Sequence, residues 1–371
     1  MGRGREQDRP RQGPCRMTTT LFTVGPVEMH PGTLRVGGEQ LPYFRTEEFS
    51  RTVLECDADL RALAGAPEGS RTALLTCSGS GAMEATVLDF LGQGDRALIL
   101  SGGSFGERFC EICDAHDLAY DALRIEPGAD LDLGRLTSLD LTRYKALFVN
   151  AHETSTGALY DIPRLGDICK RAGLLFIVDG ISSFLCDPLH MERTNIDALI
   201  FSSQKALALP PGLSMVLLTP RLAASLDERK PRSYYLGLKR HLVDMERGQT
   251  PFTPAVGVIL QLHERLGSLR ALGADGCVTR CAALASHFRQ SLSGLPFRLF
   301  PTRPSNALTA LCPTDGKSAF EIFQELRRSF GLVVTPNGGA LRDSVFRVGH
   351  MGKLSEKDLD ALTEALGRIS G

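Results

Sequence analysis

The sequence lacks an excess of charge of either sign. Its 371 residues include 42 Lys and Arg against 43 Asp and Glu, which gives a formal net charge of −1. Proteins that hold nucleic acid or an anionic membrane surface usually carry a basic surplus. The composition therefore argues against both kinds of partner.

Long apolar runs and metal-ligand spacings are missing as well. No stretch of about 18 apolar residues occurs, so we expect neither a transmembrane helix nor a secretory signal. The ten cysteines are scattered, and the pairs Cys110/Cys113 and Cys277/Cys281 have no second pair or histidines at zinc-site spacing. We therefore expect no metal site, and reduced thiols in a cytoplasmic protein.

The length predicts two domains preceded by a tail. Residues 1–16 are rich in Gly, Pro and Arg and cannot bury apolar surface, so we expect a disordered tail over 1–19. A transit peptide would explain the arginines, but the segment lacks serine and apolar periodicity and contains two acidic residues. Met17 is a plausible alternative start. We place a large domain at 20–255 and a smaller one at 256–371.

Apolar β-like runs alternate with helical patterns through the larger part. Such alternation is typical of an α/β fold with a mostly parallel sheet. The predicted strands are 72–75, 95–101, 144–150, 174–178, 198–201 and 215–218, and the helices are 81–91, 102–116 and 161–173. Beyond 255, strands within 297–311 and 331–334 and helices at 317–330 and 355–369 predict a smaller α+β domain.

Two ionisable residues follow successive predicted strands. Asp179 ends the run 174–178, and Lys205 follows the run 198–201 after a short polar turn. Ligands of α/β sheets bind at the carboxyl ends of strands. Desolvation lowers the pKa of a lysine, and its neutral amine can form a Schiff base with a carbonyl. Pyridoxal phosphate (PLP) enzymes need such a lysine and an acid opposite the pyridine nitrogen.

Several short motifs, in joint order, resemble the class V, fold-type I PLP enzymes from about Leu21 to the C-terminus. The likeness is greatest to the alanine/serine–glyoxylate and 2-aminoethylphosphonate–pyruvate aminotransferases. Its carriers are Thr23-Val24-Gly25-Pro26, Ser78-Gly79-Ser80-Gly81-Ala82-Met83-Glu84-Ala85, Gly103-Ser104-Phe105-Gly106-Glu107-Arg108, Glu153-Thr154-Ser155-Thr156-Gly157, Val178-Asp179, Ser202-Ser203-Gln204-Lys205 and Phe346-Arg347-Val348-Gly349-His350. The resemblance implies a seven-stranded-type, mostly parallel sheet in the large domain.

The resemblance also implies roles for individual residues. Lys205 would hold PLP and act as base, and Asp179 would face the ring nitrogen. Arg347 would bind the substrate carboxylate, near Gly25. The other implied cofactor contacts are Ser78, Gly79, Ser80, Phe105, Thr154, Ser202, Gln204, Thr250 and Thr253. Relatives supply the segment matching 250–253 from the neighbouring subunit, which implies a homodimer with shared sites.

One departure from the family pattern concerns His152. Relatives often place a histidine two residues before the matching glutamate, whereas this chain has Ala151 there and His152 directly before Glu153. The role of His152 is therefore open.

The sequence predicts an aminotransferase that moves an amino group from a small donor such as alanine or serine to glyoxylate or pyruvate. A 2-aminoethylphosphonate–pyruvate enzyme and a specialised biosynthetic aminotransferase stay open. A cysteine desulfurase is disfavoured, because such enzymes usually have histidine before the lysine, where this chain has Gln204, and need a mobile cysteine, whereas Cys312 adjoins a strand. A non-catalytic binding protein of this fold would have lost Lys205.

Overall fold

The structure is a computed structural model that describes residues 19–370. The predicted disordered tail falls almost entirely outside this range. Within 19–370, no helix combines the length and apolar character needed to cross a bilayer.

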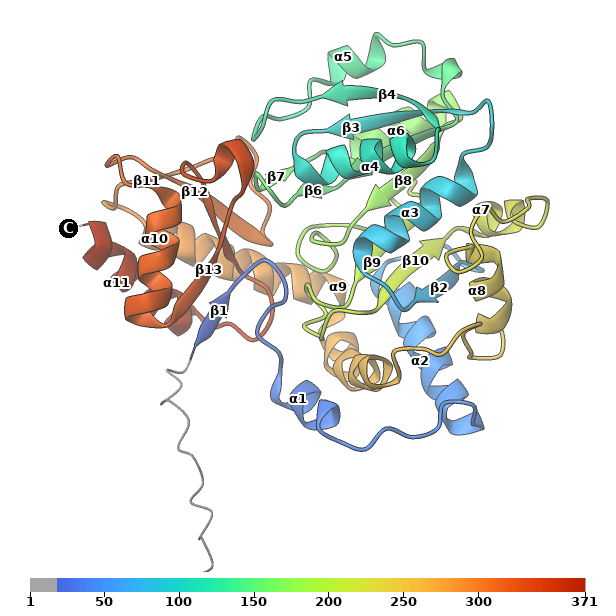
Figure 1. Ribbon diagram of the computed structural model, residues 1–371, viewed down its shortest axis with the longest axis horizontal. Coiled ribbons are helices and arrows are strands. Elements are labelled where there is room, and N and C mark those ends of the chain that lie inside the picture. The colour runs from blue at the N-terminus through green and yellow to red at the C-terminus, as the bar shows by residue number, and fades with distance from the viewer. Residues whose placement is uncertain (1–18, 371) are drawn as a thin grey trace, which may run out of the picture.

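A seven-stranded sheet forms the centre of the larger unit (Figure 1). Its spatial order is β2-β10-β9-β8-β5-β3-β4, and β10 alone runs antiparallel to its neighbours. The strands are β2 (Arg71–Leu75), β3 (Arg96–Ser101), β4 (Ala119–Arg124), β5 (Ala146–Asn150), β8 (Leu175–Asp179), β9 (Ala198–Ser202) and β10 (Ser214–Leu218). The predicted α/β fold with a mostly parallel sheet is confirmed.

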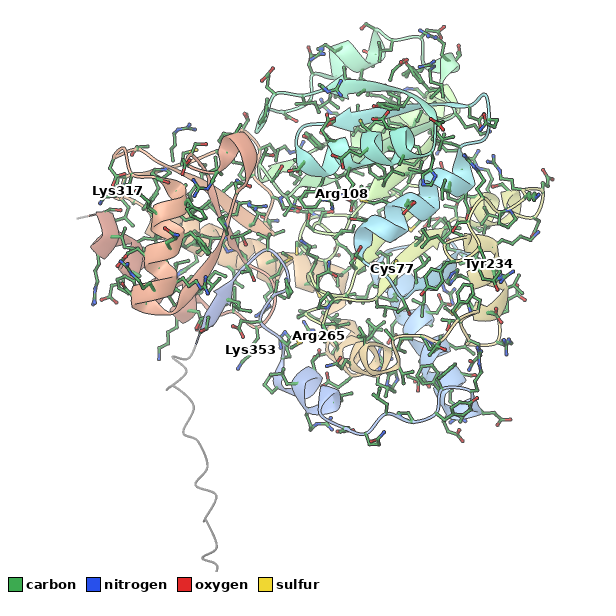
Figure 2. All side chains as sticks on the ribbon, viewed as in Figure 1. Cys77, Arg108, Tyr234, Arg265, Lys317 and Lys353 are labelled. Atoms are coloured by element: carbon green, nitrogen blue, oxygen red, sulfur yellow. The ribbon has the colours of Figure 1, made fainter. Side chains whose placement is uncertain are left out.

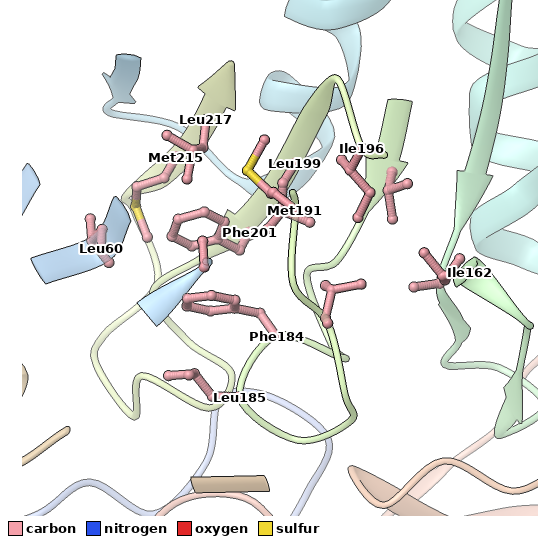
Figure 3. Packing of buried hydrophobic residues seen from close by; sticks show 14 of the residues in the cluster. Leu60, Ile162, Phe184, Leu185, Met191, Ile196, Leu199, Phe201, Met215 and Leu217 are labelled. Atoms are coloured by element: carbon pink, nitrogen blue, oxygen red, sulfur yellow. The ribbon is translucent and has the colours of Figure 1, made fainter. Parts of the chain in front are cut away.

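Helices cover both faces of this sheet, because its strands are apolar on both sides. In β9, Leu199 and Phe201 join one buried cluster while Ala198 and Ile200 join the other. Helices α2 (Glu47–Leu63) and α6 (Ile162–Ala172) pack on the first face, and α3 (Gly79–Phe90), α4 (Ser104–Ala115) and α8 (Leu238–Met245) on the second. Figure 3 shows the first cluster, in which the rings of Phe184 and Phe201 stack with centroids 4.2 Å apart.

A five-stranded sheet organises the smaller unit, in the order β1-β13-β14-β12-β11. Its strands are β1 (Thr20–Phe22), β11 (Phe297–Leu299), β12 (Leu308–Pro313), β13 (Leu332–Pro336) and β14 (Phe346–Gly349). Helices α10 (Ala319–Glu325) and α11 (Glu356–Ser370) pack against it, and a π-helical turn, η2 (Leu326–Phe330), continues α10. Strand β1 pairs in parallel with β13, so this segment near the N-terminus belongs to the sheet of the smaller unit.

One long helix, α9 (Val256–Ser291), connects the two units (Figure 1). Its first half packs in the core of the larger unit through Ile259 and Leu266, and its second half packs in the smaller core through Leu284 and Phe288. Between them the helix is broken at Gly273, whose φ of 71° favours glycine. We infer that the units divide near Gly273 rather than at the expected 255/256.

Short elements complete the fold. They are α1 (Pro31–Gly37), α5 (Leu133–Thr137), α7 (Pro220–Ser225), the hairpin of β6 (His152–Glu153) and β7 (Ala158–Leu159), and the 3-10 turns η1 (Leu141–Arg143) and η3 (Gly339–Leu341). Among the strands of the two main sheets and the helices that pack on them, α2, α8, β1 and β4 were not predicted from the sequence.

Candidate functional site

Lys205 and Asp179 lie at the carboxyl ends of the adjacent parallel strands β9 and β8. The Lys205 Nζ donates to the Val24 carbonyl oxygen at 2.7 Å, and only 8% of the residue is exposed. Burial lowers the pKa of this amine to about 8, although the carboxylate of Asp179 opposes the shift. The amine is therefore easily deprotonated near neutral pH.

Asp179 is a buried carboxylate that forms no salt bridge among residues 19–370, although the charges of Lys205 and Arg108 act on it. Its Oδ1 accepts from the Ile181 N–H at 2.8 Å, and the residue is 5% exposed. Burial raises the pKa of this carboxyl to about 7, while the bond from Ile181 works against the shift. A buried carboxylate is costly unless a positive group compensates it. The site is thus suited to a ligand that brings a cation to Asp179.

The loop 78–80 and the start of α3 form a cradle, and the Arg108 Nη1 donates to its Ser80 Oγ at 3.0 Å. The Ser78 side chain makes no capping bond, and the first turn of α3 contains no acidic residue. A Cβ on Gly79 would lie 2.4 Å from the Ile181 Cδ1 and 2.9 Å from the Ser202 Oγ. The helix start offers N–H groups and the positive end of its dipole, which attract a phosphate. Glycine at 79 lets the start of α3 pack closely against Ile181 and Ser202, at the strand ends that carry Asp179 and Lys205.

Phe105 stands at the start of α4, where Glu153 fixes it. The Phe105 and Gly106 N–H groups donate to the Glu153 Oε2 at 3.2 and 3.0 Å, and Asn150 Nδ2 donates to the same oxygen at 3.0 Å. The half-buried ring of Phe105 carries the Arg108 guanidinium at 4.8 Å from its centroid. Sequence reasoning gives Glu153 no role of its own, although an acidic residue three positions after the apolar strand β5 is a signal for a buried, hydrogen-bonded carboxylate.

A chain of hydroxyls joins Thr154 to His152. The Thr154 and Ser182 Oγ atoms are 2.8 Å apart, and the Ser182 Oγ is 2.9 Å from the His152 Nδ1. The other ring nitrogen of His152 is buried without a partner. Burial, followed by the charge of Lys205, lowers the pKa of this imidazole to about 3, so it is neutral near pH 7. His152 therefore lies within electrostatic reach of Lys205.

Arg347 reaches the site from the second sheet. It lies in β14 and is 8% exposed, and its Nη1 donates to the Thr154 carbonyl at 3.0 Å while Nη2 donates to the Pro336 carbonyl at 2.7 Å. Its Nε is buried without a partner. Burial lowers the pKa of the guanidinium to about 10, and Glu153 opposes the shift. A buried guanidinium bound only to carbonyls is well suited to a carboxylate ligand.

Gly25, Ser202 and Gln204 surround the lysine. Gly25 has a φ of 132°, and a Cβ there would lie 2.8 Å from the Lys205 Cδ. The Ser202 Oγ is 2.9 Å from the Ser214 Oγ, and Gln204 is half-buried. Gly25 is thus needed both for its backbone conformation and for the space that the lysine stem occupies.

Thr250 and Thr253 are not brought to this site by hydrogen bonds within residues 19–370. The Thr250 hydroxyl donates to the Phe252 carbonyl at 2.7 Å, and Thr253 is exposed. Their segment is anchored next to the phosphate loop, since the Ala255 N–H donates to the Thr76 Oγ1 at 3.0 Å. A role for either threonine in this chain's own site is not supported by these contacts.

The residues present fit PLP. The molecule carries an aldehyde, a ring nitrogen and a phosphate, which match the buried Lys205 amine, the buried Asp179 carboxylate and the cradle at Ser78–Ser80. Among residues 19–370, no group of His, Cys, Asp or Glu is arranged to hold a metal ion. The residues that match PLP lie where the two units meet, since Arg347 of the second sheet donates to the Thr154 carbonyl.

Comparison with known proteins gives the same assignment. The class-V aminotransferase family matches residues 43–340. The soluble hydrogenase 42 kDa subunit of Anabaena cylindrica is 32% identical over 91% of this chain and 90% of its own length. The alanine–glyoxylate aminotransferase of Oryctolagus cuniculus is 27% identical over 95% and 92%.

Solved structures agree over nearly the whole chain. An aspartate aminotransferase of Thermus thermophilus is 29% identical with a TM-score of 0.87, over 94% of this chain and 99% of that one. An alanine–glyoxylate aminotransferase of Nostoc sp. is 25% identical with a TM-score of 0.89, over 99% of both. The chain belongs to the class-V aminotransferase family and is a PLP-dependent aminotransferase.

Proposed function

We propose that the protein transfers the amino group of a small α-amino acid, such as alanine or serine, to glyoxylate or pyruvate. The observation that carries this proposal is Arg347, a buried guanidinium with an unpartnered Nε beside the Lys205 amine. One such cation suits a substrate with one α-carboxylate. Relatives named alanine–glyoxylate and L-aspartate–glyoxylate aminotransferases support the choice of glyoxylate.

The proposed division of labour follows from position and charge. When bound, PLP supplies an aldehyde that takes up the amino group and a ring that withdraws electrons from the substrate α-carbon. Arg347 binds the substrate carboxylate and orients the α-carbon towards the lysine. The Lys205 Nζ removes the α-proton, for which its lowered pKa of about 8 is suitable. Asp179 keeps a proton on the ring nitrogen.

The remaining residues position these groups. Phe105 supports one ring face, and Glu153 holds Phe105 through the start of α4. Ser78, Gly79 and Ser80 bind the phosphate, and Arg108 holds the Ser80 hydroxyl at 3.0 Å. Thr154, Ser202 and Gln204 line the same end of the sheet, and Gly25 leaves room for the lysine stem.

We further propose a cytoplasmic homodimer with shared sites, in which Lys205 holds PLP as a Schiff base. Tyr43 and Tyr234 are 69% and 75% exposed, and tyrosine is enriched at protein–protein interfaces relative to the rest of the surface. Thr253 is exposed on a segment anchored beside the phosphate loop, so its hydroxyl is free to reach the site of a second subunit. The nine cysteines in the described range are all free, as in a reducing compartment.

The desulfurase alternative is weakened by the place of Cys312. This cysteine lies within β12, is 4% exposed, and has a pKa raised by burial. A catalytic cysteine needs thiolate character and access to the substrate. Cys312 has neither.

A donor and acceptor panel tests the proposed substrates. Alanine, serine, aspartate and 2-aminoethylphosphonate would each be offered to the holoenzyme with glyoxylate or pyruvate, and the half-reaction followed by cofactor absorbance. We expect the highest kcat/KM for a small neutral α-amino acid with glyoxylate. A preference for 2-aminoethylphosphonate would instead assign a phosphonate substrate and refute the proposal.

A further inference from the structure

A second cavity lies at the junction of the two units, separate from the site described above. It has a volume of about 530 Å³ and is lined by both halves of the broken helix α9, by His30 and by the loop 350–352. Its lining includes Ala206, next to the catalytic lysine, but none of Lys205, Asp179, Arg347 or Ser78–Ser80. Small-molecule sites in proteins commonly have volumes of about 300–1,000 Å³.

The cavity presents two guanidinium groups without carboxylate partners among the described residues. Arg265, before the break in α9, is 9% exposed, and its Nη1 donates to the Ser268 Oγ at 2.6 Å while its Nε is buried without a partner. Arg280, after the break, donates to the carbonyls of Gly352 and Leu354 at 3.3 and 2.8 Å. A buried arginine without a counter-ion is costly, and an anionic ligand would remove that cost.

Two buried histidine nitrogens without partners face the same region. They are the Nε2 of His30 and the Nδ1 of His350, and both residues line the cavity. Burial, followed by the charges of Arg265, Arg280 and Lys353, lowers the pKa of His30 to about 4. Each neutral imidazole can donate or accept a hydrogen bond. Figure 2 labels Arg265 and Lys353 on this side of the junction.

One carboxylate, that of Glu264, also lines the cavity. It is packed against α1, because a Cβ added to Gly32 would lie 1.8 Å from the Glu264 Oε1. It forms no salt bridge with Arg265 within the described chain. The cations therefore outnumber the anions in the lining, and Lys353 adds a further positive charge nearby.

We propose that this cavity binds a small organic anion, a di- or tricarboxylate or a phosphate ester, between Arg265 and Arg280. Because the two arginines stand on opposite sides of the break at Gly273, one anion bound to both would join the two halves of α9. Such a ligand would stabilise one arrangement of the two units without touching the reacting atoms. The volume is too large for a halide alone to fill.

Binding would be measured on the PLP-loaded protein with citrate and inorganic phosphate as probes, at constant ionic strength set by sodium chloride. Isothermal titration and the melting temperature give two independent readouts. We expect at least one probe to bind saturably and to raise the melting temperature, and the better probe identifies carboxylate or phosphate as the preferred chemistry. Failure of both probes to bind saturably would overturn the proposal.

Three variants locate the bound anion. Arg265→Met should weaken binding by at least about tenfold, as expected for loss of a charge-assisted pair. Arg270→Met is the matched control, since Arg270 lies on the same helix but pairs with Asp59 at 3.2 Å, outside the cavity lining, and should leave binding unchanged. Arg347→Met reports on the reaction site and should also leave it unchanged.

Arg280→Met repeats the test from the other half of α9. Because Arg280 is exposed, this variant should fold even if Arg265→Met does not. It should also weaken binding. Binding that survives both cavity variants, or that is lost in Arg347→Met, would place the anion elsewhere and contradict the proposal.

Discussion

The two sheets contribute unequally to the reaction site. The seven-stranded sheet supplies Lys205 and Asp179 from neighbouring strand ends, together with the loop at Ser78–Ser80. The five-stranded sheet supplies Arg347, whose Nη1 crosses to the Thr154 carbonyl at 3.0 Å. The first set is suited to holding a cofactor, and the second provides a charge for the substrate.

This difference places the residues for the reaction in the larger unit and the residue for substrate recognition in the smaller unit. Lys205 and Asp179 are fixed to one another by the parallel pairing of β8 and β9, so their geometry does not depend on which substrate enters. Arg347 is fixed through a different sheet and a different core. Changes in the larger unit should therefore lower the rate with every substrate, whereas changes at Arg347 should depend on the carboxylate of the substrate.

Lys205→Ala gives the largest expected effect. Loss of the general base alone should lower kcat by about 10²–10⁴-fold, and loss of the covalent bond to PLP adds to it. The fold should persist, since Ala removes a buried amine bound only to the Val24 carbonyl. Single-turnover absorbance with each donor is the measurement, and turnover close to wild type would remove Lys205 from the chemistry.

Asp179→Asn should follow, with a decrease of about 10²–10³-fold in the first half-reaction, as for removal of one preorganised electrostatic group. The amide oxygen can still accept from the Ile181 N–H, so the fold should be retained. The decrease should be similar for all donors if the comparison between the sheets is correct. A loss confined to one donor would instead indicate substrate recognition.

Arg347→Lys should have a smaller, substrate-dependent effect. The lysine keeps the charge but loses the planar fork, at a cost of about 1.5–3 kcal/mol, so KM for the α-amino acid should rise about tenfold to a hundredfold. The affinity for PLP should be unchanged, because the residues proposed to bind its phosphate lie in the other unit. Steady-state kinetics measure the change in KM, and cofactor titration measures the affinity for PLP. Kinetics identical to those of the wild type with every substrate would show that Arg347 has only a structural role.

Two buried histidines, His152 in the larger unit and His350 in the smaller, should behave alike on acidification. Burial lowers the pKa of both to about 3, against an ordinary value of 6.5. Below pH 6.5 the unfolded chain binds protons that the folded chain does not, so stability falls as pH falls. The melting temperature of His152→Gln or His350→Gln minus that of the wild type should therefore increase as the pH is lowered from 7 to 5.

The difference between variant and wild type is the informative quantity. Asp89, Asp179 and Asp187 have pKa values raised by burial to about 6, 7 and 6, and they favour the folded state at low pH. Their contribution opposes that of the histidines and cancels when variant and wild type are compared. Melting curves with the same pH dependence in all three proteins would contradict the prediction.

The strand ends of the larger sheet were predictable because buried parallel strands are short continuous apolar runs with abrupt polar ends. This pattern located Asp179 and Lys205. The placement of β1 was not predictable, since three residues carry no periodicity and their partner β13 lies more than 300 positions away. Residues 256–291 read as helix on both sides of Gly273, but the sequence does not show that the two halves of α9 pack in different cores.

The role of Glu153 and the existence of the second cavity could not be predicted from the sequence for a different reason. Glu153 acquires its role through N–H groups at the start of α4, some 47 positions earlier. Arg265 and Arg280 look like ordinary helix-surface arginines until the broken helix and the loop 350–352 bring them to one cavity. Roles that depend on contacts between distant segments are visible only in the folded chain.

The central claim is that Lys205 holds the cofactor. Borohydride reduction of the PLP-loaded protein, followed by proteolysis and mass mapping, tests it directly. The account predicts one reduced pyridoxyl adduct per chain, on the peptide that contains Lys205, and none in Lys205→Ala. An adduct on another lysine, or equal labelling of Lys205→Ala, would contradict it.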